Sequence, residues 1–186
     1  MMIDDRSQNG SALLELSVVT LVLMLLFLGV FEATRAFQAH LAVNTISRHA
    51  GVTVYQDCNN QMTRQALRLG TQASCYQSRS AAVLAMERNS NVLKEANSRL
   101  GLHTSYWEWD ATGGACVEVF PPVQNNATHV VATSRINTAD VSFARLCQQL
   151  QQLTVAEAFY RYRPGIPAIS GMFGFRERTL YAVGIL

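Results

Sequence analysis

The hydrophobic residues of this chain are concentrated near its N-terminus. Residues 11–31 form the apolar stretch SALLELSVVTLVLMLLFLGVF, which contains one ionisable residue, Glu15. An α-helix needs about 20 mostly apolar residues to cross the hydrocarbon core of a bilayer, whereas the apolar part of a cleaved secretory signal has only about 7–15. The length of the stretch therefore predicts a transmembrane helix surrounded by the lipid bilayer.

The helical pattern continues past this stretch, and no small-residue cleavage site interrupts it. Apolar residues recur there at spacings of three or four: Val30, Ala33, Phe37 and Leu41. Such spacing places them on one face of a helix. We therefore expect one continuous helix over about 11–50, about 60 Å long at about 1.5 Å per residue. Its transmembrane half would cover 11–31, and an extramembrane half would follow over 32–57.

Beyond the long helix, the pattern predicts a folded head over 58–186. Segments of helical character cover 61–69, 78–100 and 139–153. Segments of strand character cover 106–109, 116–120, 129–136, 155–162 and 178–186. Gly101 is expected to cap the second helix, and Gly113 with Gly114 to form the turn of a hairpin. Strands joined mainly by turns and single helices predict an antiparallel sheet with helices on one face, so the fold class is α+β.

Composition and charge favour a folded chain without a nucleic-acid partner. Of the 186 residues, 49% are hydrophobic and 15% are charged, against about 25% charged in an ordinary soluble domain. This composition argues against disorder. The formal net charge is only +2, and the charges are scattered along the chain, so nucleic-acid binding is not expected.

Glu15 requires an explanation, because a carboxylate inside a membrane segment costs about 2.5–3.5 kcal/mol on insertion scales. One explanation is that Glu15, near the start of the stretch, lies at headgroup depth and meets water. Another begins with Gly10, because cleavage between Gly10 and Ser11 would create an α-amino group close to Glu15 in sequence. On one helix the geometry is poor, but the amine of a neighbouring subunit, shifted along the helix axis, would neutralise the carboxylate. Such a pair would set the register of a helix bundle.

Several segments of the chain resemble known families. The string NGSALLE at 9–15, followed by an apolar helix, resembles the class III signal of type IV pilins and pseudopilins. In that signal the leader is cut after a glycine, and glutamate is the fifth mature residue. The stretch LGVFEATRAF at 28–37 is similar to the post-membrane stretch of TadE-like proteins, the minor pseudopilins of tight-adherence pilus systems. FYRYRPGIP at 159–167 and RTLYAV at 178–183 resemble the closing strands of that family.

The resemblance implies a minor pilin-like structural subunit and not an enzyme. Residues 1–10 would be a leader that a prepilin peptidase removes by cutting between Gly10 and Ser11. Glu15 would then act when the helix assembles with other pilin-like subunits and with the inner-membrane assembly platform of a tight-adherence, type IV-like pilus. The protein would cross the bacterial inner membrane once, with its N-terminus in the cytoplasm and its head in the periplasm. After assembly it would lie in the pilus or at the cell surface.

The cysteines all follow the predicted transmembrane helix: Cys58, Cys75, Cys116 and Cys147. No C-x-x-C pair occurs, and the histidines are scattered without ligand spacing: His40, His49, His103 and His129. A metal site or another cofactor is therefore not expected. Four cysteines allow three disulfide connectivities, and we favour Cys58 with Cys75 and Cys116 with Cys147 because each closes a modest loop. Free buried thiols are the alternative, whereas two disulfides would indicate an oxidising compartment.

Catalytic motifs do not offer a competing interpretation. The sequence contains no glycine-rich phosphate loop, no G-x-S-x-G and no H-E-x-x-H. Trp107 and Trp109 would share one face of a strand, where they would either cover a core or stack on a sugar or a partner. The alternative function is therefore an uncut, signal-anchored receptor whose periplasmic domain binds a ligand or partner. A tethered hydrolase lacks a nucleophile and a base in recognisable context.

Overall fold

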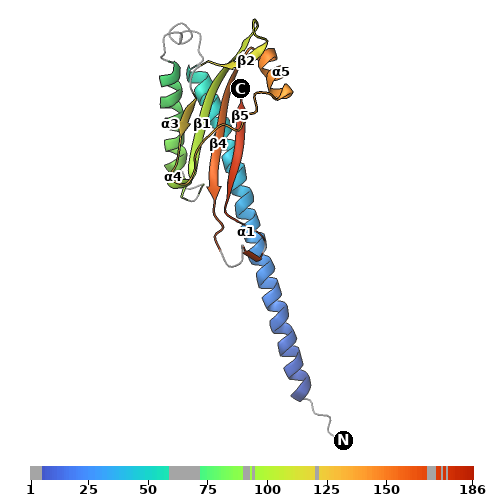
Figure 1. Cartoon of the computed structure of the whole chain (residues 1–186). Coiled ribbons are helices and arrows are strands. Elements are labelled where there is room, and N and C mark those ends of the chain that lie inside the picture. Colours follow the sequence, from blue (N-terminus) through green and yellow to red (C-terminus); the bar gives the residue numbers. More distant parts are fainter. Residues whose placement is uncertain are drawn as a thin grey trace. The chain divides into compact units, whose positions relative to one another are not determined.

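The computed structural model of the chain describes residues 6–58, 72–89, 93, 95–119, 122–166, 171–172, 174 and 176–186, without the side chains of 6–11 and 72. The described elements are, in chain order, α1 (Arg6–Cys58), α3 (Gln72–Asn89), α4 (Ala96–Arg99), β1 (Leu100–Asp110), β2 (Ala115–Glu118), β3 (Val123–Asn125), α5 (Val141–Leu150), β4 (Gln152–Tyr162) and β5 (Arg178–Ile185). A long N-terminal helix precedes helices and an antiparallel sheet, which confirms the predicted α+β class (Figure 1).

The chain divides into two compact units. The anchor unit consists of Met1–Phe37 and Arg163–Glu177, and the sheet unit consists of Gln38–Tyr162 and Arg178–Leu186. The anchor unit contains the apolar stretch of α1, and the sheet unit contains the described strands.

Helix α1 extends beyond the predicted 11–50 at both ends. It is unbroken over Arg6–Cys58, a segment that contains no proline to remove a backbone donor. In the sheet unit, its buried side chains recur at spacings of three or four: Val43, Ile46, Ala50 and Val54. This stripe makes the second part of α1 an amphipathic core helix.

The sheet has the strand order β2-β1-β4-β5, with β3 also paired to β1, and every pairing is antiparallel. The long strands β1 and β4 are neighbours, and their register places His103 opposite Glu157 and Trp107 opposite Leu153. Side chains alternate between the two faces along a strand. These four residues therefore lie on one face, and the residues directly before and after each of them in the strands lie on the other.

Helices α1 and α3 cover the second of these faces. The hydroxyl oxygen of Tyr76 in α3 lies 2.8 Å from that of Thr154 in β4, and Tyr76 also packs with Tyr106 of β1 in a buried cluster. The Cys58–Cys75 disulfide joins the end of α1 to the start of α3. The disulfide closes a short loop, as the sequence favoured, and both of its cysteines border this cluster.

Helix α5 covers the face that contains Trp107. Phe143 of α5 packs edge-on against the Trp107 ring, with centroids 5.4 Å apart, and both side chains are buried. The Cys116–Cys147 disulfide joins β2 to α5 and is the second pairing that the sequence favoured. The expectation of helices on one face is therefore wrong. Both faces of β1 and β4 are largely buried, and each needs its own cover.

The helix predicted over 78–100 ends earlier than expected. After α3 and the short α4, strand β1 already begins at Leu100, so Gly101 lies inside a strand and does not cap a helix. A Cβ atom on Gly101 would lie 3.2 Å from Val130 Cγ1, a contact tighter than most side chains tolerate. The glycine allows close packing of the chain against β1, which explains its presence in a strand.

The strand predicted over 129–136 is not among the described strands. Val130 forms only an isolated bridge with Ala127, and the Arg135 N–H donates to the Glu157 carboxylate at 2.8 Å rather than to a neighbouring strand. Side-chain acceptors of this kind replace sheet pairing in the segment.

The remaining predicted strands are found, and β3 is an additional strand that the pattern did not reveal. The expected hairpin joins β1 to β2, with Gly114 at a φ of 65° in its turn, a backbone conformation that glycine adopts without strain. The helix predicted over 61–69 lies outside the described residues.

Replacing Gly184 in β5 should separate the sheet from α1. A Cβ atom on Gly184 would lie 2.8 Å from the Ser47 carbonyl oxygen and 3.1 Å from Arg48 Cα, both backbone atoms of α1. Because a backbone yields little, we expect Gly184→Ala to lower the free energy of unfolding by about 1–3 kcal/mol. Urea unfolding of the detergent-solubilised chain, followed by tryptophan fluorescence, measures this change.

Gly51→Ala in α1 is the matched control. The closest atom to its added Cβ would be Leu186 Cδ1 at 2.8 Å, the end of a flexible side chain, and alanine favours a helix over glycine by about 1 kcal/mol. We expect little loss of stability. Equal losses in the two variants would contradict the close backbone packing of α1 on β5.

Candidate functional site

The first half of α1 is apolar and exposed. Leu14, Met24 and Phe27 are 70%, 67% and 75% exposed. Exposed apolar surface on this scale indicates contact with lipid or with another protein. Among the described residues, α1 is the one helix long and apolar enough to cross a membrane, over Ala12–Cys58.

The polar side chains of this half differ in how they are satisfied. The Ser17 hydroxyl donates to the Leu14 carbonyl, and the Thr20 hydroxyl donates to the Leu16 carbonyl, both at 2.8 Å. These bonds within the helix satisfy the two hydroxyls without water, as a membrane interior requires. Within the described part of the chain, Glu15 is exposed and makes no hydrogen bond or ion pair. If it enters lipid, its carboxylate therefore needs a partner other than the described residues of this chain.

Gly10 and Ser11 lie within the first turns of α1. The peptide bond that joins them is therefore helical, and their side-chain surroundings are not described. Cleavage at this bond stays a prediction.

Glu32, directly after the apolar stretch, was not singled out from the sequence. Its side chain is fully buried, and its Oε1 accepts a hydrogen bond from the Gly165 N–H at 2.7 Å. The Arg35 guanidinium lies 3.7 Å from Glu32 Oε2 and 5.9 Å from the centre of the Phe31 ring. The available signal was an acidic residue at the end of an apolar helix. Its partner, more than a hundred positions away, could not be inferred.

A second buried polar cluster lies on the sheet. His103 Nδ1 of β1 lies 3.1 Å from Glu157 Oε2 of β4, and both side chains are buried. Glu157 Oε1 also accepts hydrogen bonds from the Tyr181 hydroxyl and the Arg135 N–H, each at 2.8 Å. Burial raises the pKa of Glu157, but its close contact with His103 and hydrogen bonds from Ser134, Arg135 and Tyr181 outweigh it and lower the pKa overall. Burial, reinforced by Glu157, raises the pKa of Tyr181. The lowered pKa favours the charged form of Glu157, and in this form its carboxylate links β1, β4 and β5.

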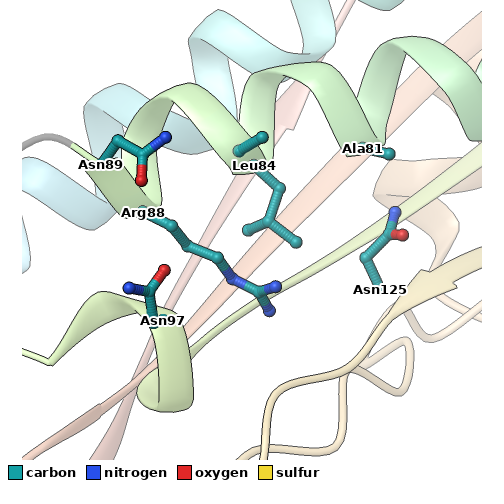
Figure 2. Close-up of a pocket in the computed structure, with 7 residues that line it drawn as sticks. Ala81, Leu84, Arg88, Asn89, Asn97 and Asn125 are labelled. Carbon is teal, nitrogen blue, oxygen red and sulfur yellow. The ribbon is translucent and has the colours of Figure 1, made fainter.

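A polar pocket lies between α3, α4 and β3, and Figure 2 shows Arg88 of α3 reaching into it. One guanidinium nitrogen donates to the Leu100 carbonyl at 2.9 Å and to the Asn126 carbonyl at 3.1 Å. Burial lowers the pKa of Arg88. The described lining residues include no carboxylate, imidazole or thiol. The arginine therefore joins α3 to backbone carbonyls of β1 and of the chain after β3.

The cysteines and tryptophans take structural positions. Both cysteine pairs are disulfides, and in the described part of the chain no three metal-ligating side chains come together. Trp107 is buried, and its indole N–H donates to the Ser105 hydroxyl at 2.9 Å. Trp109 is partly buried and packs against the hydrophobic cluster that contains Trp107 and Phe143. The predicted tryptophan pair is therefore core packing and not an exposed stacking platform.

These features define a class of protein: an α+β domain that follows an N-terminal helix with an exposed apolar half of membrane-spanning length. Residues 10–51 match the sequence model of the family described as TadE-like protein. The match includes Gly10, Ser11 and Glu15, and it confirms the resemblance seen in the sequence. Comparisons with curated proteins and with solved structures give no match.

Replacing Glu157 with glutamine should weaken the sheet in a pH-dependent way. We expect Glu157→Gln to lower the free energy of unfolding at neutral pH by on the order of 2 kcal/mol, because hydrogen bonds to a charged acceptor become bonds to a neutral one. Since folding lowers the pKa of Glu157, its stabilising contribution is present above the unfolded-state pKa and is lost as the pH falls through the folded-state pKa. The difference in the free energy of unfolding between the unaltered chain and Glu157→Gln should therefore become smaller at acidic pH.

Urea unfolding from acid to neutral pH measures this difference. Glu108→Gln is the control, because Glu108 also accepts a hydrogen bond from a tyrosine hydroxyl, that of Tyr106 at 2.8 Å, but is exposed. A loss of stability that is independent of pH, or equal in both variants, would show that the charge of Glu157 has no role.

Proposed function

We propose that the chain is a minor pilin-like subunit of a tight-adherence pilus, inserted by the first half of α1 into the bacterial inner membrane. The observation that supports this most directly is the position of Glu15. It lies in an exposed apolar helix in which the hydroxyls of Ser17 and Thr20 bond to the helix's own carbonyls, and it follows Gly10 within the segment that matches the TadE-like family.

The proposed topology places the N-terminus in the cytoplasm and the sheet unit in the periplasm. The disulfides Cys58–Cys75 and Cys116–Cys147 support this orientation, because disulfides persist in oxidising compartments. Long domains after a membrane helix are translocated largely regardless of their charge, so the charges of the sheet unit are compatible with this orientation.

In this proposal a prepilin peptidase removes residues 1–10. Gly10 lets the backbone of the enzyme approach closely, since it has no side chain. Glycine also lowers helix stability by about 1 kcal/mol relative to alanine, which helps α1 to unwind at a peptide bond that the protease must reach. Ser11 then becomes the first residue and bears a new α-amino group.

Assembly follows from the new charge. In lipid there is little hydrophobic drive for helices to associate, so packing and specific polar contacts decide their arrangement. The α-amino group at Ser11 of one subunit pairs with Glu15 of another pilin-like subunit, and this removes an unpaired carboxylate from the apolar medium. The exposed apolar side chains of 12–31 then pack against neighbouring helices, with the inner-membrane platform as the place of assembly.

The uncut receptor is the weaker alternative. It would use the tryptophan pair for binding, but Trp107 is buried against Phe143. It also gives no reason for Glu15, which has no partner among the described residues. The N-terminal residue of the mature protein distinguishes the two functions.

Gly10→Val should keep the leader attached. The added side chain blocks the approach of the peptidase and leaves the rest of α1 apolar. Intact-mass spectrometry of the chain, produced together with an active prepilin peptidase, measures the loss of residues 1–10. Ala12→Val, which adds similar bulk two positions later, is the control and should be cut. If the unaltered chain also keeps Met1 in this experiment, the proposed function is wrong.

Glu15→Ala should be cut normally but assemble poorly. The change removes the partner of the new amine, and an unpaired charge in lipid costs about 2.5–3.5 kcal/mol, which corresponds to a loss of assembly of about 60- to 300-fold. The measurement is the fraction of subunit recovered in sheared pilus fractions. Ser17→Ala removes a hydroxyl that bonds within its own helix, so this control should assemble normally. Normal assembly of Glu15→Ala would exclude the charge pair.

A further inference from the structure

The anchor unit contains a second segment beside the end of the apolar helix. The hydrogen bond from the Gly165 N–H to Glu32 fixes Gly165 at the residue that follows the apolar stretch. That stretch, of about 20 residues at about 1.5 Å each, is as long as the hydrocarbon core of a bilayer is thick. In a membrane-anchored chain, Gly165 therefore lies at the depth where hydrocarbon meets the lipid headgroups.

The described residues that flank Gly165 in the sequence, within the same anchor unit, have the chemistry of a membrane interface. Met172 is 69% exposed and Ile166 is half-buried. Arg163 and Arg176 are exposed within the same unit, with Glu177 as an exposed acidic neighbour. Apolar side chains next to arginines are typical of segments that lie in the interface, where the apolar groups enter the acyl boundary and the cations contact phosphates.

We propose that Arg163, Ile166, Met172 and Arg176 form a lipid-binding surface, the interfacial surface, which contacts anionic phospholipids of the leaflet that borders Glu32. Met172 and Ile166 enter the upper part of the acyl region, and the two arginines bind headgroup phosphates. This inference rests on the membrane-anchored form in the proposed function. It adds a second contact with the membrane, which holds α1 at one depth until the subunit is extracted for assembly.

Continuity with the apolar helix favours lipid over a protein partner as the occupant. The hydrogen bond of Gly165 joins the segment to α1 directly at the end of the apolar stretch. The two arginines match the negative surface of a bilayer that contains anionic lipid. A neighbouring subunit is the competing occupant, and the experiment below separates the two.

Tryptophan quenching by brominated lipid tests the proposal on the full chain. The chain is reconstituted in vesicles of phosphatidylcholine and phosphatidylglycerol whose acyl chains bear bromine close to the headgroup. Single variants place a tryptophan at Met172 (Met172→Trp) or at Val141 of α5 (Val141→Trp), and fluorescence is compared with the unaltered chain to subtract Trp107 and Trp109. Val141 is 69% exposed, like Met172, but belongs to the sheet unit, so it is the matched control. A third variant, Leu21→Trp, reports whether α1 itself is in the bilayer.

We expect the added emission of Met172→Trp to shift to the blue and to be lost in brominated vesicles, with Val141→Trp unaffected and Leu21→Trp quenched by bromine placed deeper in the chains. If Leu21→Trp is quenched and Met172→Trp behaves like Val141→Trp, the interfacial surface does not exist and the proposed function stands. If Leu21→Trp is not quenched, the membrane span fails and the proposed function fails with it. A blue shift of Met172→Trp in lipid-free micelles that grows with protein concentration would identify another subunit as the occupant and overturn the proposal.

The arginines are tested in the same background. Adding Arg163→Gln and Arg176→Gln to Met172→Trp should reduce its quenching in vesicles with phosphatidylglycerol, because each arginine near an anionic surface contributes roughly fivefold to binding. The quenching of Leu21→Trp with the same two changes should stay constant. Unchanged quenching of Met172→Trp would remove phosphate binding from the proposal.

Discussion

The organisation of this protein depends on the requirement that a polar group in lipid finds a partner. The first half of α1 meets that requirement at Ser17 and Thr20 with its own carbonyl groups. In the proposed assembly, the carboxylate of Glu15 takes its partner from another subunit. A helix with one such group is stable in a bilayer only at a cost, and the cost disappears when a second subunit supplies a positive charge. The proposed assembly therefore removes the free-energy cost of an unpaired carboxylate inside the membrane.

Helix α1 serves two environments within one unbroken element. Its first half exposes apolar side chains over most of its circumference, as a lipid-facing helix does. Its second half narrows to the buried stripe from Val43 to Val54, which suits packing on a sheet. The change occurs near Glu32, which is buried and bonded to Gly165.

Local patterns predicted the parts of the fold that depend on local physics. The long helix, the α+β class, the β1–β2 hairpin and both disulfide pairs follow from apolar length, alternation, turn residues and loop size. Gly101 was misassigned because a glycine after a polar helical segment has the same signature as a cap. It is in fact a strand residue that a distant Val130 approaches. Sequence spacing gave no information about that contact.

The candidate site divides in the same way. Gly10, Ser11 and Glu15 were identified from a string of neighbouring residues, and their segment lies in the TadE-like match. The bond between Glu32 and Gly165 and the pair of His103 with Glu157 join residues far apart in the chain. Only the paired strands and the anchor unit bring them together, so no local pattern could reveal them.

In the proposed function as a filament subunit, the Cys58–Cys75 disulfide has a mechanical consequence. It joins the last residue of α1 to α3, which packs through Tyr76 on the central strands. Tension applied along α1, as when a pilus is pulled, must therefore load a covalent link as well as the packing of one helix. The strands and α3 therefore resist separation from α1.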